Sequence, residues 1–280
     1  MPLTSPRFRN ERELMAIEAN HAVMRRGSHG RHVHLVQMAL IDLGFGMPIS
    51  TSSNDYSPDG VYGIETENVV KAFQRSLPPP GLTPDGVLGR LTLRELDKRH
   101  PQFTHRFNLH FRSLALSDVP FDRLMSGAAQ IYAQYGVEAR FASGQSLGLS
   151  LEQEDRFNVV RQNCNWVMNS GEFADLHRLG PPVPDNDIAV FIVNQFQEST
   201  VAGCGGHAFS RPACAITHDA YRWDVAHEVC HVLLTSSFVP QHTVSPRNLM
   251  FATSSQDAEP RTLTEKQLAR IRSSPLCRSV

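Results

Sequence analysis

His227-Glu228-Val229-Cys230-His231, written HEVCH, decides how the second half of this chain is interpreted. On an α-helix, residues four apart lie on one face a turn from each other, so both imidazoles can reach a single ion. Neutral imidazole is a good zinc ligand, and a catalytic zinc site takes three protein ligands and leaves one position for water. Glu228 lies about 100° round the helix from His227, where it can meet that water and not the metal. The stretch therefore predicts a helix that binds one Zn²⁺ ion through His227 and His231.

The residues around this stretch agree with an amphipathic helix. From Val225 to Leu234, apolar side chains gather on one side of the helical wheel and the two histidines on the other. The alternative is a buried helix whose histidines only form hydrogen bonds, which the glutamate in register and a third histidine, His242, disfavour. HEVCH matches the HExxH motif of zinc peptidases, in which the glutamate is the general base. The motif predicts a zinc metallopeptidase with Glu228 as its catalytic residue.

Length and composition are typical of a globular protein with two domains. The chain has 280 residues, of which 41% are hydrophobic and 20% charged. Its formal net charge is −1 and no basic run stands out, which argues against nucleic-acid binding. No apolar stretch approaches the ~18 residues of a membrane span. The start, Met1 to Arg12, lacks the apolar core of a secretory signal peptide, so a trimmed signal, another export route and retention in the cell all stay open.

Five cysteines, an odd number, cannot all pair within one chain. Cys204 and Cys214 flank a loop and can close a disulfide in an oxidising compartment, with buried free thiols as the alternative. Cys230 lies on the apolar side of the HEVCH helix, which favours a place in the core over a place among the metal ligands.

An internal repeat organises the first half of the chain. Pro58-Asp59-Gly60-Val61-Tyr62-Gly63 returns after 26 residues as Pro84-Asp85-Gly86-Val87-Leu88-Gly89. In each copy an Asp-Gly turn leads to a glycine and then to a threonine suited to capping the next helix. An earlier helical pattern, with apolar residues from Val33 to Leu43, is stopped by Gly44 and Gly46. The first half is therefore expected to form three short helices, each entered from a tight turn.

This region resembles the bacterial peptidoglycan-binding domain found beside many cell-wall hydrolases. The resemblance covers about residues 24–98 and rests on both Asp-Gly-x-x-Gly turns, Arg26-Gly27-Ser28-x-Gly30, a Val-x-Leu-x-Gln run ending at Gln37, and Lys71-x-Phe73-Gln74. It implies a wall-binding module with peptidoglycan as its partner. The loop from Pro48 to Ser57 is longer than usual in that family. A three-helix spacer that has lost ligand binding is the alternative, because a fold does not guarantee a function.

The second half alternates strand and helix patterns. Strands are expected at 107–116, 137–141, 187–193 and 213–217, helices at 121–135 and 264–272 besides the HEVCH helix, and an insertion or long loop at 142–184. The division expected for the whole chain is a polar leader at 1–23, a peptidoglycan-binding-like helical domain at 24–98, a linker at 99–104 and a zinc metallopeptidase domain at 105–280.

This order of elements, together with HEVCH, His242 and Asn248-Leu249-Met250, resembles the metzincin clan of zinc peptidases. The resemblance implies that the active-site helix lies under a mixed sheet, and that a tight turn places Met250 as an apolar floor beneath the metal. The expected fold class is α+β, with a small all-α three-helix N-terminal domain and a metzincin-like α/β peptidase domain.

One departure from the clan concerns the third zinc ligand. The usual continuation is HExxHxxGxxH, but here Leu234 occupies the glycine position and Ser237 the last histidine position. The helix can then run on through Thr235, and His242 has to be delivered by a loop. His242 is the favoured third ligand, while Asp257 or Glu259 would give a His₂-carboxylate site instead.

A metzincin-like site implies a mechanism. Zinc lowers the pKa of its bound water toward ~7, and Glu228 takes the proton and passes it to the leaving amine. The stretch 202–207 lies where the clan has the strand that edges the cleft, and Gly205 would allow an extended substrate to approach closely. His207 is a candidate for steadying the oxyanion, with a plain loop histidine as the alternative.

The resulting hypothesis is a zinc-dependent endopeptidase targeted to the bacterial cell wall by its peptidoglycan-binding module, and secreted or held in the cell envelope. Its substrate is a protein or peptide. Three alternatives remain: a hydrolase of peptidoglycan stem peptides or cross-bridges, an exported toxin or effector, and a non-catalytic wall-binding protein with a structural zinc.

Overall fold

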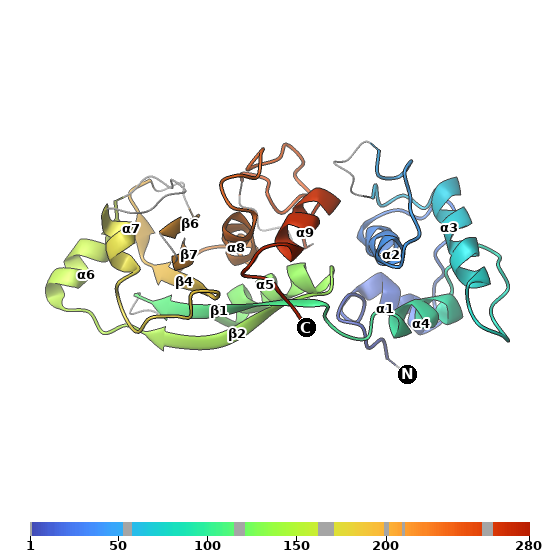
Figure 1. Cartoon of the computed structure of the whole chain (residues 1–280), viewed down its shortest axis with the longest axis horizontal. Coiled ribbons are helices and arrows are strands. Elements are labelled where there is room, and N and C mark those ends of the chain that lie inside the picture. The colour runs from blue at the N-terminus through green and yellow to red at the C-terminus, as the bar shows by residue number, and fades with distance from the viewer. Residues whose placement is uncertain are drawn as a thin grey trace. The chain divides into compact units, whose positions relative to one another are not determined.

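The computed structural model describes residues 2–52, 58–114, 121–161, 171–198, 202–208, 211–253 and 260–280. The chain forms two compact units that divide in the sequence between Thr104 and His105, and the short segments Ala133–Val137 and Thr264–Leu268 group with the first unit. The α+β class is as predicted, with a helical first unit and a mixed sheet in the second (Figure 1). Across these residues, no helix is both long and apolar enough to cross a membrane.

The first unit is built around short helices that share one apolar core. The described residues form α1 (Arg12–Glu18), α2 (Arg31–Asp42), α3 (Ile64–Arg75) and α4 (Arg90–Lys98), of which the last three match the expected helices. Val36, Val70, Phe73 and Leu93 are almost fully buried in this core. Each such side chain contributes roughly 1.5–3 kcal/mol through the apolar surface it removes from water.

The segment expected as a polar leader is part of this core. Leu3, Phe8, Leu14 and Ile17 are buried against the helices, and the carboxylate of Asp97 at the end of α4 accepts backbone hydrogen bonds from the N-terminal segment, the shortest at 2.8 Å. The expectation of a separate leader at 1–23 was wrong because a few widely spaced apolar residues in a polar stretch carry no clear period. Their burial depends on a partner surface elsewhere in the chain.

The two Asp-Gly turns have the same network of hydrogen bonds. In the first, Gln37 Nε2 donates to Asp59 Oδ1 at 3.0 Å, to Val61 O at 3.1 Å and to Thr66 Oγ1 at 3.0 Å, while Gln37 Oε1 accepts from Gly60 N–H at 3.0 Å. The repeat in the sequence is therefore a repeat of a side-chain network around a turn.

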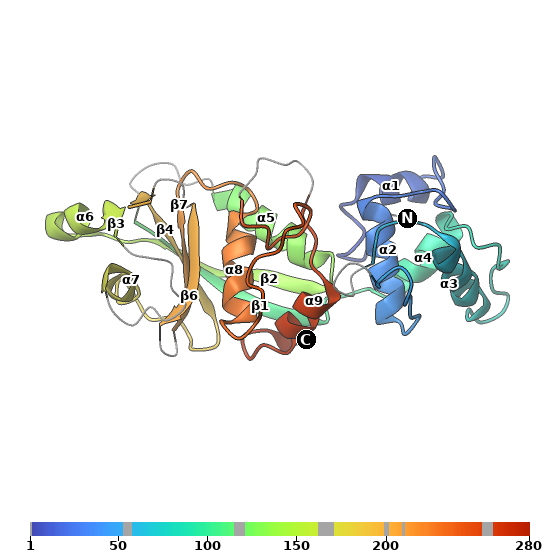
Figure 2. The same cartoon turned by 90° about the horizontal axis from the view of Figure 1, so that it is seen from above.

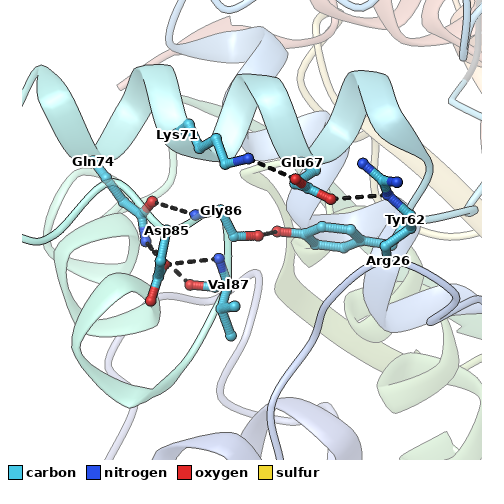
Figure 3. A network of polar contacts seen from close by, with 8 residues as sticks. All are labelled: Arg26, Tyr62, Glu67, Lys71, Gln74, Asp85, Gly86 and Val87. Atoms are coloured by element: carbon cyan, nitrogen blue, oxygen red, sulfur yellow. Dashed lines mark hydrogen bonds and ion pairs between the residues drawn. The ribbon is translucent and has the colours of Figure 1, made fainter.

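In the second turn, shown in Figure 3, Gln74 takes the place of Gln37. Its Nε2 donates to Asp85 Oδ1 at 2.8 Å, to Val87 O at 3.1 Å and to Thr92 Oγ1 at 3.1 Å, and its Oε1 accepts from Gly86 N–H at 2.9 Å. The hydroxyl of Tyr62 donates to Gly86 O at 2.9 Å and so connects the first copy to the second. Every polar atom of the two glutamine amides thus has a partner within the unit.

Glycine is required at the centre of both turns. Gly60 has φ +70° and Gly86 has φ +74°, a left-handed conformation that other residues rarely adopt. A Cβ atom on Gly86 would also lie only 2.7 Å from Glu67 Cγ. Each turn also pairs with the segment 24–29 through one isolated β-bridge, the first between His29 and Val61 and the second between Met24 and Leu88.

The second unit is organised by one mixed sheet. Its strands are β1 (His105–Ser113), β2 (Val137–Ser146), β4 (Ile188–Val193), β6 (Gly203–Ala208), β7 (Arg211–Thr217) and β8 (Arg278–Ser279), in the order β2-β1-β4-β7-β6 with β8 beside β1. Strands β1, β4 and β7 are parallel to one another, whereas β6 is antiparallel to β7. Among the described residues, the glycine-rich strand β6 is thus the end strand of the sheet.

Helices cover both faces of this sheet. Helix α8 (Asp224–Leu234) packs on one face against β4, β6 and β7, and the hydroxyl of Tyr132 in α5 (Phe121–Ala133) donates to Ala226 O at 2.9 Å. Figure 2 shows α8 and α7 (Gly171–Leu176) on opposite sides of these strands. All six residues of β4 are buried, as expected for a strand covered on both faces. Helix α9 (Glu265–Arg272) follows near the C-terminus.

The stretch 142–184 is more ordered than its composition predicted. Its described parts hold the end of β2, α6 (Leu151–Phe157), β3 (Val159–Val160) and α7, and β3 pairs with β5 (Gln195–Phe196) in a separate ladder. Phe157, Val160 and Phe173 pack with the sheet face that carries Phe191. Of the two expectations, an insertion or a long loop, the long loop was wrong, because these elements are too short to show a period, although Ser150 and Gln153 do form a capping box.

Candidate metal centre

Helix α8 and strand β6 approach each other closely because β6 carries glycines. A Cβ atom on Gly205 would lie 2.6 Å from Glu228 O and 2.8 Å from His231 Cβ, and one on Gly203 would lie 2.5 Å from Glu228 Cγ. Real Cβ atoms do not approach other atoms so closely, so any other residue at these positions would push the strand away from the helix. The glycines of β6 therefore place the edge of the sheet directly against HEVCH.

Three histidines bring their ring nitrogens together at this place. His231 Nε2 lies 3.1 Å from His227 Nε2 and 3.1 Å from His242 Nε2. One potential ligand atom from each ring falls within a group whose members all lie within 4.8 Å of one another. The first two histidines come from α8 and the third from the loop after it, as the sequence predicted.

A hydrogen bond to the backbone decides which ring nitrogen His227 offers to a metal ion. His227 Nδ1 lies 2.7 Å from Leu249 O, so it carries the proton and donates to that carbonyl, which leaves Nε2 unprotonated. Leu249 is positioned by the Asn248-Leu249-Met250 turn, in which Asn248 Oδ1 accepts from Met250 N–H at 2.8 Å. The sequence pattern pointed to this turn for its methionine and gave no sign of its Leu249 carbonyl.

The cluster fits a zinc ion better than it fits hydrogen bonding alone. A single ring nitrogen has one proton at most, so His231 Nε2 cannot form N–H···N bonds with both neighbours. Two nitrogens on one tetrahedral zinc at ~2.0–2.1 Å are about 3.3 Å apart, close to the spacing of these rings. Three neutral imidazoles converging through Nε2 are a donor set that suits zinc.

Burial keeps these histidines neutral. It lowers the pKa of His227 from 6.5 to about 4, despite the hydrogen bond to Leu249, and the pKa of His231 to about 2, with His227 and His242 adding to the effect. The pKa of His242 is lowered by the same cause. A neutral imidazole is the form that binds a metal, so at neutral pH all three rings are ready to bind without first losing a proton.

The helix ends one residue earlier than expected. Helix α8 stops at Leu234, and Thr235 has φ +63°, so the helix does not run on through Thr235. Thr235 combines this positive φ with an extended ψ of 169°, so the chain leaves the helix axis at once and does not form the usual left-handed helical cap. Arg270 holds this conformation from outside, since its Nε donates to Leu234 O at 3.1 Å and its Nη2 to Thr235 Oγ1 at 2.9 Å.

Gln241 holds the loop that delivers His242. Its Nε2 donates to three backbone carbonyls, those of Thr235 at 3.2 Å, Ser236 at 3.3 Å and Phe238 at 2.6 Å. The side chain of Gln241 also lies next to the ring of His231. One amide therefore holds the end of the helix and the loop that leads to His242, a role that sequence reasoning missed because nothing in the motif marks a glutamine at this place.

Glu228 is buried beside the cluster, with 7% of its surface exposed. The N–H of Gly205 donates to its carboxylate. Burial, together with the negative charge of Asp224, raises the pKa of Glu228 from 4.5 to about 8. A cation at the histidines would lower this pKa again, because an opposite charge favours the ionised carboxyl.

The other predicted site residues are placed as follows. Met250 is fully buried, and its carbonyl accepts from Thr243 N–H at 2.9 Å, next to His242. His207 lies in β6 opposite Pro212, while its side chain falls outside the described part of the structure. Asp257 and Glu259, the alternative third ligands, also lie outside the described residues.

The predicted pairing of Cys204 with Cys214 was wrong. Cys204 is in a disulfide, but Cys214 is a buried free thiol. The register explains this, because Cys204 lies opposite Ala215 and Gly205 lies opposite Cys214. Since neighbouring residues of a strand point to opposite faces, Cys204 and Cys214 are on different faces of the sheet. Cys230 is buried and free, as expected for a core residue.

A cleft of about 920 Å³ contains the cluster. It is lined by all three histidines and Glu228, by Ala202 and the start of β6 as far as Gly205, and by residues that include Tyr221 and Arg261. A volume of this size is at the upper end of that of ligand pockets. The histidines are therefore open to a ligand the size of a short peptide.

Comparison with known proteins gives matches for two parts of the chain. No curated protein matches it. Among solved structures, an archaemetzincin from Methanopyrus kandleri is similar, with 10% identity and a TM-score of 0.40 over 60% of this chain and 94% of that one. A similarity of that size says nothing about activity. Residues 29–96 match the family described as "Putative peptidoglycan binding domain", so the helices α2, α3 and α4 form a domain of the peptidoglycan-binding type.

Proposed function

We propose that this protein is a zinc-dependent endopeptidase that its peptidoglycan-binding domain targets to the bacterial cell wall. The observation that carries the proposal is the convergence of three Nε2 atoms next to a buried glutamate in an open cleft. His227, His231 and His242 are the proposed ligands of one Zn²⁺ ion. When bound, a zinc ion polarises a substrate carbonyl and lowers the pKa of a water molecule.

Glu228 is the proposed general base. Its place next to His227 on α8, and the N–H bond from Gly205, hold its carboxylate toward the side of the helix that faces β6. From there it takes a proton from the attacking water and gives it to the leaving amine. A purely structural metal site would have no use for a buried carboxylate in this position, so Glu228 favours an enzyme over a non-catalytic binding protein.

Strand β6 is the proposed docking edge for the substrate. Within the described residues it is the end strand of the sheet, and its residues from Gly203 to Gly205 line the cleft. An extended peptide can add to such an edge through backbone hydrogen bonds. Gly205 would let it approach closely, Met250 would form the floor below the ligands, and His207 is a candidate for steadying the oxyanion. This arrangement favours peptide and protein substrates.

The test compares two substrates and two variants of the full chain. Zinc-loaded wild type is incubated with casein and with purified sacculi, and Glu228→Gln is measured beside it. Loss of the base is expected to lower kcat by about 10²–10⁴-fold, with zinc content unchanged. Glu152→Gln, at an exposed position of α6, is the matched control and should keep full activity.

The outcomes separate the alternatives. Cleavage of casein supports the endopeptidase, whereas cleavage of sacculi alone supports a hydrolase of peptidoglycan stem peptides or cross-bridges. Folded, zinc-loaded protein that cuts neither substrate would exclude the peptidase proposal. Binding of the Glu228→Gln chain to sacculi, measured by co-sedimentation, tests the targeting role independently of catalysis. Without such binding the domain is a spacer, and an exported toxin or effector becomes the better interpretation.

A further inference from the structure

A second cavity lies on the other face of the sheet from the histidines. Its volume is about 310 Å³, and it is lined by the segment 177–185 that follows α7 and by residues of β1, β4 and β7. Phe191 of β4 lines it and belongs to the core on the α7 side. The cavity shares no lining residue with the histidine cleft. It is therefore a separate site.

The cavity contains a buried arginine that has no counter-charge among the described residues. Arg112 lines it and is only 5% exposed, and its register opposite Phe191 puts both side chains on the same face of the sheet. Its Nε has no hydrogen-bond partner within the described chain. Burial lowers the pKa of Arg112, and no described carboxylate is close enough to oppose that effect. A buried charge left unpaired costs several kcal/mol, which an anion would remove.

A chain of hydrogen bonds holds this guanidinium in place. Arg112 Nη1 donates to Phe111 O at 2.9 Å and to Ser143 Oγ at 3.2 Å. Ser143 Oγ lies 2.8 Å from His110 Nδ1, and His110 Nε2 lies 3.0 Å from Asp187 Oδ2. One end of the guanidinium is thus anchored to the sheet, while Nε is buried and has no hydrogen-bond partner among the described residues.

The rest of the lining favours an anion with a small apolar body. Arg178 and Arg211 are exposed residues of the lining, and Asp185 is the acid among the described lining residues. Between them the wall is apolar, formed by Leu179, Pro181, Pro182, Val183, Phe191 and Pro212. The balance of charge attracts an anion, and the apolar wall would bury the part of the ligand that has no charge.

We propose that this cavity binds a small monocarboxylate, with Arg112 as the residue that recognises its carboxylate. The planar guanidinium matches a carboxylate in shape and donates parallel hydrogen bonds to it. A volume of about 310 Å³ is at the lower limit for ligand pockets, which suits a molecule of amino-acid size and excludes a long chain. The proposal is independent of the zinc site and of any peptidase activity.

The test uses a matched pair of probes on the full-length protein. N-acetyl-L-alanine and its uncharged amide differ only in the carboxylate, and both are titrated by calorimetry at constant ionic strength, with inorganic phosphate as a second anion. The acid should bind at least tenfold more tightly than the amide and than phosphate. Arg112→Gln should weaken binding of the acid by about 10–100-fold, the size expected for a buried charge-assisted pair.

Two controls keep the outcome decisive. Arg140→Gln removes an exposed cation of β2 that does not line the cavity, and it should change affinity less than threefold. Because Arg112→Gln can disturb folding, amide NMR shifts of the wild type are followed as well, and the acid should shift residues of 177–191 while the amide does not. Equal binding of acid and amide, no binding of the acid, phosphate binding more tightly than the acid, or unchanged affinity in Arg112→Gln would each overturn the proposal.

Discussion

The Asp-Gly turns of the first unit and the histidine cluster of the second are both made of buried polar groups, but only the turns are complete. Gln74 donates to three acceptors and accepts from Gly86, and Gln37 does the same one repeat earlier. His231 Nε2 instead faces two ring nitrogens at 3.1 Å and can satisfy only one of them with a proton.

This difference separates a structural network from a binding site. Fully satisfied buried polar groups stabilise a fold without help from a ligand, whereas partly satisfied ones lower its stability until a partner arrives. The turns should therefore be indifferent to metal, and the cluster should depend on it.

Zinc removal is expected to have the largest effect, and only in the second unit. At a free zinc concentration of about 1,000 times Kd, binding stabilises the folded state by about 4 kcal/mol, which a chelator would remove. Hydrogen exchange of backbone amides, measured by mass spectrometry with and without chelator, resolves the two units. Exchange should speed up in α8 and in 241–250 and stay unchanged in α2, α3 and α4. Equally faster hydrogen exchange in both units would contradict the claim that only the second unit depends on zinc.

Loss of either turn glutamine should be the next largest effect. Gln37→Ala and Gln74→Ala each leave a buried Gly N–H and several acceptors unsatisfied, at a cost of roughly 2–3 kcal/mol in the free energy of unfolding of the first unit. Urea denaturation measures it. Lys71→Met, in the same region but at a partly exposed ion pair with Glu67 (Figure 3), should cost under about 1 kcal/mol. A glutamine variant no worse than Lys71→Met would show that the networks add little.

A smaller effect is expected from Gln241→Ala. Without this side chain the loop before His242 loses three hydrogen bonds and His231 loses a neighbour that orients its ring. Zinc affinity should fall about 10–100-fold, the range for residues that orient metal ligands, with less change in the metal-free stability. Competition with a chelator measures the affinity. The control is Gln153→Ala on α6, a partly exposed glutamine that does not line the histidine cleft. It should leave zinc affinity unchanged. If zinc affinity does not change in Gln241→Ala, the loop is held in some other way.

The smallest effect is the pH dependence of zinc binding. Because burial lowers the pKa of His227 to about 4 and of His231 to about 2, both stay neutral at pH 5. Kd for zinc should change less than about tenfold between pH 7 and 5, whereas three histidines that titrate at 6.5 would lose roughly 10⁴-fold. Calorimetric titrations at several pH values measure it. A change of a thousandfold would show that the rings are exposed.

The same shifts set the sign of the stability change in metal-free protein. The unfolded chain takes up protons at these histidines near pH 6.5 and the folded chain does not, so stability is present above 6.5 and is lost as pH falls toward 4. Burial also lowers the pKa of His34 in the first unit to about 4, which gives that unit the same dependence. In the second unit Glu228 opposes this loss, because its raised pKa of about 8 lets the folded state bind a proton before the unfolded state does. Only the second unit should respond to zinc.

Local patterns predicted the parts of this protein that depend on neighbours in the chain. HEVCH predicted helix α8 and the face of that helix on which His227 and His231 lie. The repeated Asp-Gly sequence predicted the turns before α3 and α4. The polar leader and the loop at 142–184 were misjudged, because their few apolar residues are buried by surfaces far away in the sequence. The roles of the Gln241 amide and the Leu249 carbonyl were not predicted either, because a hydrogen bond made by an amide or a carbonyl leaves no pattern in the sequence.

What the sequence alone determined is therefore chemistry with a fixed spacing: a pair of imidazoles one helical turn apart, a carboxylate beside them, and glycines in tight turns. Helix and turn geometry depend on a few adjacent residues, so they can be predicted from the amino-acid sequence. The tertiary structure decided which ring nitrogen His227 presents, where His242 arrives, why Cys204 and Cys214 do not pair, and that Arg112 is buried with no counter-charge among the described residues. Each of these depends on the register and packing of segments that are far apart in the chain, which no local spacing records.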